Sequence, residues 1–351
     1  MVCSAYSPVG ALDRLRRRRV RARFAVTRAR GELDFTQVYD DDFAGWPLAP
    51  QGRGHGVYGT FLNPTTGWPS GMPGLRTGYH LAIDVLVNDA RGAQPVFAIE
   101  GGRVREAKHS WQTTPLEERV RAGVVGVGHF RYAHLVPSVA VGDAVAAGQE
   151  IGRTSPGWWH VHLEELAWVA GKRVLLNPLR PGGKLVPVVD GGRPVVSVMR
   201  IYPKAAENDP SPTALPLDRV RGTVVPVALA MDVFPLKEWP KAPVVPLHVY
   251  RARTLLKRGE TVVLERMLFQ IDRAPGPTWQ HYFRPLTRRS APVAVCVVQK
   301  PASCAGQFWL RLWEKGWDTT RVPNGRYALT LTVEDTVGQR ASRTLRFRVA
   351  N

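Results

Sequence analysis

Short apolar runs separated by turn-forming residues dominate this chain beyond its first 42 positions. Residues 85–87, 95–99, 123–127 and 161–166 are runs of this kind, and glycine or proline recurs between them. Runs of this length are typical of strands, because a helix that buries one face shows a regular period over about ten or more residues. The pattern therefore predicts an all-β fold. Residues 115–122, which contain Leu-Glu-Glu-Arg, are an exception and predict one or two helical turns.

The C-terminal residues give the clearest strand signal. Apolar residues occupy every second position in residues 327–333 and again in residues 345–349, and a turn-rich segment over residues 334–339 separates the two runs. An alternation of period two buries one face of a strand and leaves the other face in water, as in an antiparallel sandwich. We expect a β-hairpin at this end of the chain, within a β-sandwich domain.

A bridge rich in proline and glycine, residues 180–217, interrupts the strand pattern and contains one short strand over residues 195–201. We expect three parts on this basis. Residues 1–42 form a basic, poorly ordered arm, residues 43–183 form an antiparallel β-sheet domain, and residues 184–351 form a linker and the β-sandwich domain.

The charge of the chain is unusually basic. It has 48 lysines and arginines against 29 aspartates and glutamates, a formal net charge of +19. This balance suggests an anionic partner, such as nucleic acid, a membrane surface or an acidic wall polymer. However, only nine of the basic residues are lysine, and abundant Arg, Ala, Gly, Pro and Val together are typical of GC-rich coding. No nucleic-acid-binding motif is recognisable and no run of about 18 apolar residues occurs, so neither specific nucleic-acid binding nor a transmembrane segment is expected.

Histidines carry the strongest chemical signal, and seven of the nine lie in the first half of the chain. His160 and His162 are two residues apart and would face the same side of a strand. His80 and Asp84 are four residues apart, which also puts two side chains on one face. An imidazole with a carboxylate suits a borderline cation such as zinc. A His/Asp/His zinc site is therefore geometrically possible, and His134 lies between its two halves.

Residues 43–180 resemble the catalytic domain of the lysostaphin/LytM-type zinc metallopeptidases, which cut peptide cross-links in bacterial cell walls. Each motif is weak alone, but together they occur in the order that this family shows. The matching pieces are His80-x-x-x-Asp84, strand residues 92–98 and 102–104, Tyr132-Ala-His134-Leu135, the turns of Val141-Gly-Asp and Gly148-Gln149-x-Ile151-Gly152, His160-x-His162-Leu163-Glu164, and Asn177-Pro178.

The resemblance implies that His80, Asp84 and His162 bind Zn²⁺ and leave the fourth coordination position to a water molecule, the nucleophile. It implies that His134 and His160 are catalytic residues that flank this water and the scissile carbonyl. One would act as the base or orient the water, and the other would support the oxyanion or protonate the leaving amine. The sequence leaves open which does which. It contains no His-Glu-x-x-His motif and therefore no helical glutamate for this purpose.

Two further features concern the surroundings of this site. Glu164 would share its side of the strand with His162 and hold an imidazole in place. Residues 110–119 depart from the family pattern as an insertion, which we expect to reshape one wall of the substrate groove.

Residues 185–351 resemble a bacterial immunoglobulin-like module, on the strength of Asn324-Gly-Arg-Tyr327 and the run that ends at Gly338. Such a module would either bind the cell wall or serve as a structural appendage, and both alternatives stay open. Cys296 and Cys304 flank a loop, so a disulfide and two free thiols are both possible. Cys3 lies in the arm and has no evident partner.

Together these features predict a zinc metalloendopeptidase that hydrolyses the peptide cross-links of peptidoglycan. The alternative is a non-hydrolytic cell-envelope protein that binds wall peptides or activates another hydrolase. The family works outside the membrane, so the resemblance implies a cell-envelope or secreted location, although no signal peptide is visible. The bond that is cut and the oligomeric state are not predicted.

Overall fold

A computed structural model describes residues 45–62, 80–87, 93–109, 122–156, 158–206, 213–235, 244–274, 309–313 and 315–351. These residues form strands and two short 3₁₀ turns, and no α-helix occurs among them, which confirms the all-β prediction. The described segments also include no helix with the length and apolarity that crossing a bilayer requires. Several predictions concern residues outside the described segments: the arm, the helical turns over 115–122 (all but Ala122), the insertion at 110–119, and Cys3, Cys296 and Cys304.

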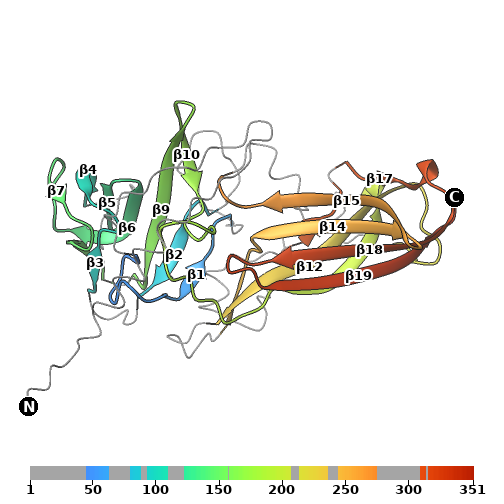
Figure 1. Cartoon of the computed structure of the whole chain (residues 1–351), viewed down its shortest axis with the longest axis horizontal. Helices are drawn as coiled ribbons and strands as arrows, with labels where there is room; N and C mark the ends of the chain where they lie inside the picture. The colour runs from blue at the N-terminus through green and yellow to red at the C-terminus, as the bar shows by residue number, and fades with distance from the viewer. Residues whose placement is uncertain are drawn as a thin grey trace, which may run out of the picture. The chain divides into compact units, whose positions relative to one another are not determined.

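The first half of the described chain forms one large antiparallel sheet (Figure 1). Its main path runs β1-β2-β9-β6-β5-β4-β7; β10 pairs with β9, and β8 pairs with β6 and β3. Consecutive strands are often joined by tight turns, as β5 and β6 are, where Gly128 takes a positive φ of 55°. The strands are β1 (Val57–Gly59), β2 (Ile83–Leu86), β3 (Pro95–Phe97), β4 (Gly102–Lys108), β5 (Gly123–Val127), β6 (Phe130–Pro137), β7 (Ala144–Val145), β8 (Glu150–Thr154), β9 (His160–Val169) and β10 (Lys172–Leu176).

The alternation of β9 decides which face of this sheet carries polar side chains. Val161 and Leu163 are fully buried in a hydrophobic core that also contains Val85 of β2. Successive side chains of a strand point to opposite faces, so His160 and His162 lie on the other face. Each buried Val or Leu contributes about 1.5–3 kcal/mol, and a slip of one residue would expose this set, so the register of β9 is strongly determined.

Two further antiparallel sheets enclose a second hydrophobic core, the arrangement of a β-sandwich. Ile201 of one sheet and Leu256 and Leu329 of the other are members of this core. The predicted C-terminal hairpin is confirmed as β18 and β19, which pair along ten residues each. One sheet consists of β11 (Val195–Pro203), β12 (Thr223–Pro235), β13 (Val244–Leu247), β16 (Trp309–Arg311) and β17 (Trp317–Asp318), and the other of β14 (Arg251–Arg258), β15 (Thr261–Gln270), β18 (Gly325–Glu334) and β19 (Arg340–Val349).

Each hydrophobic core includes side chains from the other side of the predicted domain boundary. Leu175 of β10 belongs to the second core, whereas Phe234 and Leu247 belong to the first. The side-chain amide of Asn177 donates a hydrogen bond to the carbonyl of Ile271 at 2.8 Å. The division at residues 183 and 184 therefore stays a prediction.

Candidate metal centre

Two neighbouring strands bring a carboxylate and an imidazole together. In the pairing of β2 with β9, Asp84 lies directly opposite His162, and on the other side of β9 His162 lies opposite Ala133 of β6. Side chains of directly opposite residues share one face of the sheet and lie within contact distance. The small side chain of Ala133 leaves the space beside His162 to larger neighbours.

The third member of the group reaches the same point from outside the strand. The sequence predicts an extended segment that carries both His80 and Asp84, but β2 begins only at Ile83, after a bend at Ala82. His80 therefore meets Asp84 through this bend. Its backbone carbonyl accepts a hydrogen bond from the amide of Leu62, which anchors the segment beside the end of β1.

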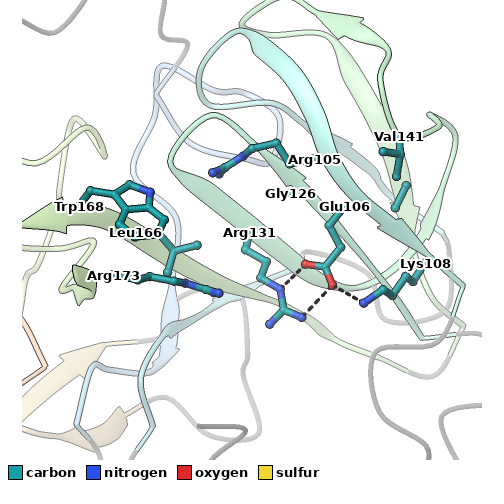
Figure 2. A pocket seen from close by; sticks show the side chains of 10 residues that line it. Arg105, Glu106, Lys108, Gly126, Arg131, Val141, Leu166, Trp168 and Arg173 are labelled. Atoms are coloured by element: carbon teal, nitrogen blue, oxygen red, sulfur yellow. Dashed lines mark hydrogen bonds and ion pairs between the residues drawn. The ribbon is translucent and has the colours of Figure 1, made fainter. Parts of the chain in front are cut away.

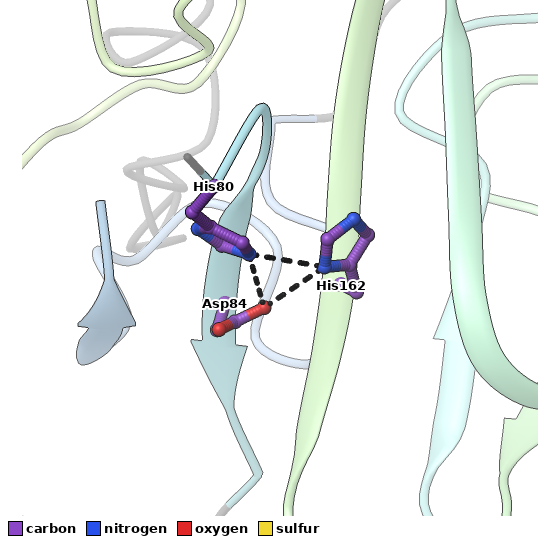
Figure 3. Close-up of side chains that lie close together, drawn as sticks. All are labelled: His80, Asp84 and His162. Atoms are coloured by element: carbon purple, nitrogen blue, oxygen red, sulfur yellow. Dashed lines mark hydrogen bonds and ion pairs between the residues drawn. The ribbon is translucent and has the colours of Figure 1, made fainter. Parts of the chain in front are cut away.

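The three predicted zinc ligands converge on one point (Figure 3). His80 Nε2 lies 3.1 Å from Asp84 Oδ1 and 3.1 Å from His162 Nδ1. His162 Nδ1 lies 3.2 Å from the same carboxylate oxygen. The donor atoms thus form a nearly equilateral triangle.

This triangle has the dimensions of one face of a zinc site. Ligand atoms at 2.0–2.1 Å from a tetrahedral ion lie about 3.3–3.4 Å apart. The observed edges of 3.1 and 3.2 Å are shorter by only a few tenths of an ångström. Two imidazoles and one carboxylate are also a donor set that zinc accepts in catalytic sites. The residues therefore fit the ion.

In each imidazole, the nitrogen that points away from the centre contacts an oxygen atom, and this orients the other nitrogen toward the centre. His80 Nδ1 lies 3.2 Å from the carbonyl oxygen of Thr60, to which it can only donate, so Nε2 keeps its lone pair for a ligand. His162 Nε2 lies 3.6 Å from Glu164 Oε1. Glu164 in turn accepts from the guanidinium of Arg131 at 3.4 Å. Glu164 thus lies where the sequence predicts it, beside an imidazole.

The electrostatics of the group favour a positive charge at its centre. Burial raises the pKa of Asp84, but the nearby His80, His160 and His162 outweigh it and hold that pKa well below its ordinary value. Burial lowers the pKa of His162, but its contacts with Asp84 and Glu164 outweigh this and raise the pKa to about 9. A carboxylate field that stabilises a proton on His162 also stabilises a bound cation.

His134 occupies an irregular position of β6 beside this centre. Gly123 of β5 pairs with Leu135 and Val124 pairs with Ala133, so His134 is the extra residue of a β-bulge. Its φ is 67°, in the left-handed region that non-glycine residues rarely adopt. Bulges redirect side chains, and functional sites commonly contain them.

The bulge depends on a glycine in the opposite strand. A Cβ atom added at Gly123 would lie 2.1 Å from the carbonyl oxygen of Lys108 and 2.8 Å from that of Leu135. Any other residue would therefore push β5 away from its neighbours. Gly123 therefore allows β5 to approach the backbones of its neighbours closely, and this close approach permits the bulge at His134.

The imidazole of His134 is packed between rings. It stacks on Trp158 with a centroid distance of 3.6 Å and an interplanar angle of 7°. It meets His160 edge to face at 4.8 Å, and His162 at 5.8 Å. Burial, followed by the neighbouring histidines, lowers the pKa of His134 well below its ordinary value.

His160 lies on the same face of β9 as His162. Its Nε2 is 3.5 Å from Asp84 Oδ1, and the centroid of its ring lies 4.9 Å from that of Trp159. Burial lowers its pKa to about 4, although the charge of Asp84 acts in the opposite direction. The structure thus brings all five predicted site residues together on one side of the sheet.

A hollow of about 340 Å³ lies on the same sheet, further along β9 (Figure 2). Leu166 and Trp168 line it and share the face of β9 that carries His162. Trp168 is 66% exposed and borders the hollow. The charged residues of its lining are four basic side chains and one acidic one: Arg105, Lys108, Arg131, Arg173 and Glu106.

Sequence reasoning missed several residues that shape the site. The Trp-Trp pair directly before His160 was a visible signal for Trp158, because aromatic residues beside a histidine motif can pack on its rings. Gly59 and Thr60 carry no local signal, since their role arises only when β1 pairs with β2. The remaining described histidines have no part in the centre: His55, His109, His129 and His248. His281 lies outside the described residues.

Gly59→Ala is expected to weaken metal binding. A Cβ atom at this position would lie 2.5 Å from Asp84 Oδ2 and 3.3 Å from His80 Cε1, so the carboxylate must move. We expect zinc affinity to fall by about 10–100-fold, the usual effect of disturbing a ligand's support. Competition with a chromogenic chelator measures this. Gly126→Ala is the matched control, because its Cβ would lie 3.4 Å from its nearest neighbour. Equal affinities in both variants would contradict the prediction.

No protein-family model, curated protein or solved structure matches this chain. A functional assignment for this chain therefore rests on the geometry of the described residues.

Proposed function

We propose that this protein is a zinc metalloendopeptidase that hydrolyses peptide cross-links of bacterial peptidoglycan. The observation that carries the proposal is the triangle of His80 Nε2, Asp84 Oδ1 and His162 Nδ1, with edges of 3.1 to 3.2 Å. Three protein ligands leave one position of a tetrahedral ion open, which is typical of catalytic zinc sites. Two more imidazoles, of His134 and His160, lie beside it.

His80, Asp84 and His162 would hold the ion. Zinc at this position would supply Lewis acidity, which polarises a substrate carbonyl and makes water a competent nucleophile near neutral pH. His134 and His160 would handle protons, because an imidazole can accept a proton at one nitrogen and donate from the other. The stacking of Trp158 on His134 fixes the plane of that ring, and it excludes water from one face of it.

The hollow beside Trp168 supports a peptide substrate that bears carboxylates. Its floor continues the face of β9 that carries His162, and Arg131 links the two, since it contacts Glu164 beside His162. The excess of basic over acidic side chains favours an anionic segment. The exposed Trp168 ring offers an apolar surface for small side chains or for a peptide backbone.

Zinc content and sacculus digestion together test this function. Protein purified without chelators should contain about one zinc ion per chain. It should release soluble muropeptides from purified sacculi, and a chelator should abolish the release until zinc is added back. A fully zinc-loaded protein that releases nothing would reject hydrolysis and favour the alternative, a non-hydrolytic protein that binds wall peptides.

Trp168→Ala is expected to weaken substrate use without loss of zinc. Truncation of an aromatic anchor commonly costs more than about 1–2 kcal/mol of binding, which corresponds to roughly a tenfold fall in kcat/KM. Muropeptide release at several substrate concentrations measures the effect, which should reside mainly in KM. Val262→Ala is a control of similar exposure, since Val262 lies on β15 and is 52% exposed. Unchanged kcat/KM for Trp168→Ala would contradict a substrate role for the hollow.

A further inference from the structure

Three aspartates from distant parts of the sequence meet at a second position. Asp190 lies in the bridge that follows the first sheet, Asp232 lies on β12, and Asp335 lies in the turn between β18 and β19. Each offers a carboxylate oxygen, and these three atoms all lie within 4.8 Å of one another. None of the three residues belongs to the zinc centre.

Asp232 and Asp335 are buried, Asp190 is half-buried, and their carboxylates are incompletely satisfied. Asp335 is 1% exposed and Asp232 is 4% exposed. Asp335 Oδ1 accepts from the amides of Val337 and Gln339, but its Oδ2 is buried without a hydrogen-bond partner, and so is Asp190 Oδ2. An unpaired carboxylate oxygen in the interior is destabilising unless a proton or a cation satisfies it. This part of the fold therefore leaves acceptor oxygens directed at no donor among the described residues.

No described basic side chain forms an ion pair with any of the three aspartates. Burial, and then the charges of Asp190 and Asp335, raise the pKa of Asp232 to about 8. Burial chiefly raises the pKa of Asp190 to about 6 and also raises that of Asp335. The nearby Glu334 adds a further negative charge, although it is paired with Arg251 and Arg340. Three carboxylates so arranged require either protons or a cation.

We propose that Asp190, Asp232 and Asp335 form a calcium-binding site. Hard divalent cations prefer carboxylate oxygens, and all three donors here are carboxylates. Two oxygens on opposite sides of a Ca²⁺ ion lie about 4.6–5.2 Å apart, so a group within 4.8 Å fits its shell. Mg²⁺ fits less well, because it demands near-ideal octahedral geometry and usually binds through one or two carboxylates with several waters.

Calcium at this position would join the bridge to the sandwich. The side-chain amide of Gln339, in the same turn as Asp335, already donates to the backbone carbonyls of Asp190 and Gly192. A cation shared by the bridge, β12 and the β18–β19 turn would add three ionic contacts to this attachment. The proposed site thus stabilises the segment that connects the two hydrophobic cores, and it does not depend on the zinc centre or on peptidase activity.

Thermal unfolding of the full chain in calcium tests the proposal. Sites of this kind outside cells bind Ca²⁺ with a Kd of about 0.1–1 mM. Calcium at about a hundredfold excess over Kd should raise the midpoint of unfolding by about 5 °C. Calorimetric titration with calcium chloride should give a stoichiometry near one in protein whose zinc centre is already loaded. No shift and no binding heat with the native sequence would overturn the proposal.

Asp232→Asn and Asp190→Asn should each abolish the calcium-dependent shift. Asparagine keeps the shape of the side chain and its carbonyl acceptor, so both variants should fold and keep their zinc. Asp218→Asn is the matched control, because Asp218 is an exposed carboxylate of the same part of the chain, and it should retain the full shift. A shift that persists in both cluster variants would overturn the proposal. Stability that responds to acid but not to calcium would do so too, because protons alone would then satisfy the cluster.

Discussion

His162→Ala should remove zinc and peptidoglycan hydrolysis together. His162 Nδ1 is one corner of the three-atom triangle, and its ring is held by Asp84 on one side and Glu164 on the other. Binding of zinc by four ligands contributes about 10–16 kcal/mol, so loss of one protein ligand should cost about 3–4 kcal/mol, a factor of roughly 100–1000 in affinity. Asp84→Asn should give the same result, since it also removes the negative charge that the cation needs.

Metal analysis after dialysis measures zinc, and sacculus digestion measures hydrolysis. The control is His109→Ala, an exposed histidine that directly follows β4 and lies outside the centre. It should keep both zinc and activity. Full zinc occupancy in His162→Ala, or full activity without zinc, would contradict the assignment of His162 as a ligand.

His134→Asn should abolish most of the activity and leave zinc in place. The imidazole of His134 lies next to the metal ligands without belonging to the triangle, and general acid–base groups of this kind contribute about 10²–10⁴-fold to a rate. Asparagine is the appropriate replacement because the φ of His134 is 67°, and asparagine tolerates this region better than most residues. An alanine variant would combine the loss of the imidazole with backbone strain.

His160→Gln should act in the same direction, with a loss of kcat and retained zinc. Circular dichroism and the midpoint of thermal unfolding show whether either variant disturbs the fold. Trp158→Phe is a useful companion, because it keeps a ring stacked on His134 and should therefore retain most of the activity. If His134→Asn or His160→Gln lost its zinc, that residue would be a ligand, and the division of roles between the five residues would be wrong.

Local sequence was sufficient for much of the fold. The predicted run of residues 123–127 has the same bounds as β5. The alternation in residues 327–333 and 345–349 predicted the β18–β19 hairpin. These elements depend on period-two burial and on nearby turns, which are local properties. The bend between His80 and β2 was not predicted, because the contacts that anchor it come from residues 60–62, which follow the neighbouring strand β1.

The composition of the candidate zinc centre was also visible in the sequence. The i, i+2 spacing of His160 and His162 placed both rings on one face of β9, and the motif order supplied Asp84 and His80. Their convergence was not visible, because it depends on the register that sets Asp84 opposite His162. The carboxylate cluster had no signal at all, since Asp190 and Asp335 are 145 positions apart.

The sequence by itself determined an all-β chain, its C-terminal hairpin, and which residue types were available to bind a metal. Only the tertiary structure decided where those residues meet, because strand register and the bulge at His134 arise from pairing between distant segments. Outside the basic arm, the sequence did not show where positive charge gathers, and only the pairing of the strands brings Arg105, Lys108, Arg131 and Arg173 around one hollow. Alternation along a strand is a local property of its residues, whereas the partner opposite each residue depends on burial of the whole sheet.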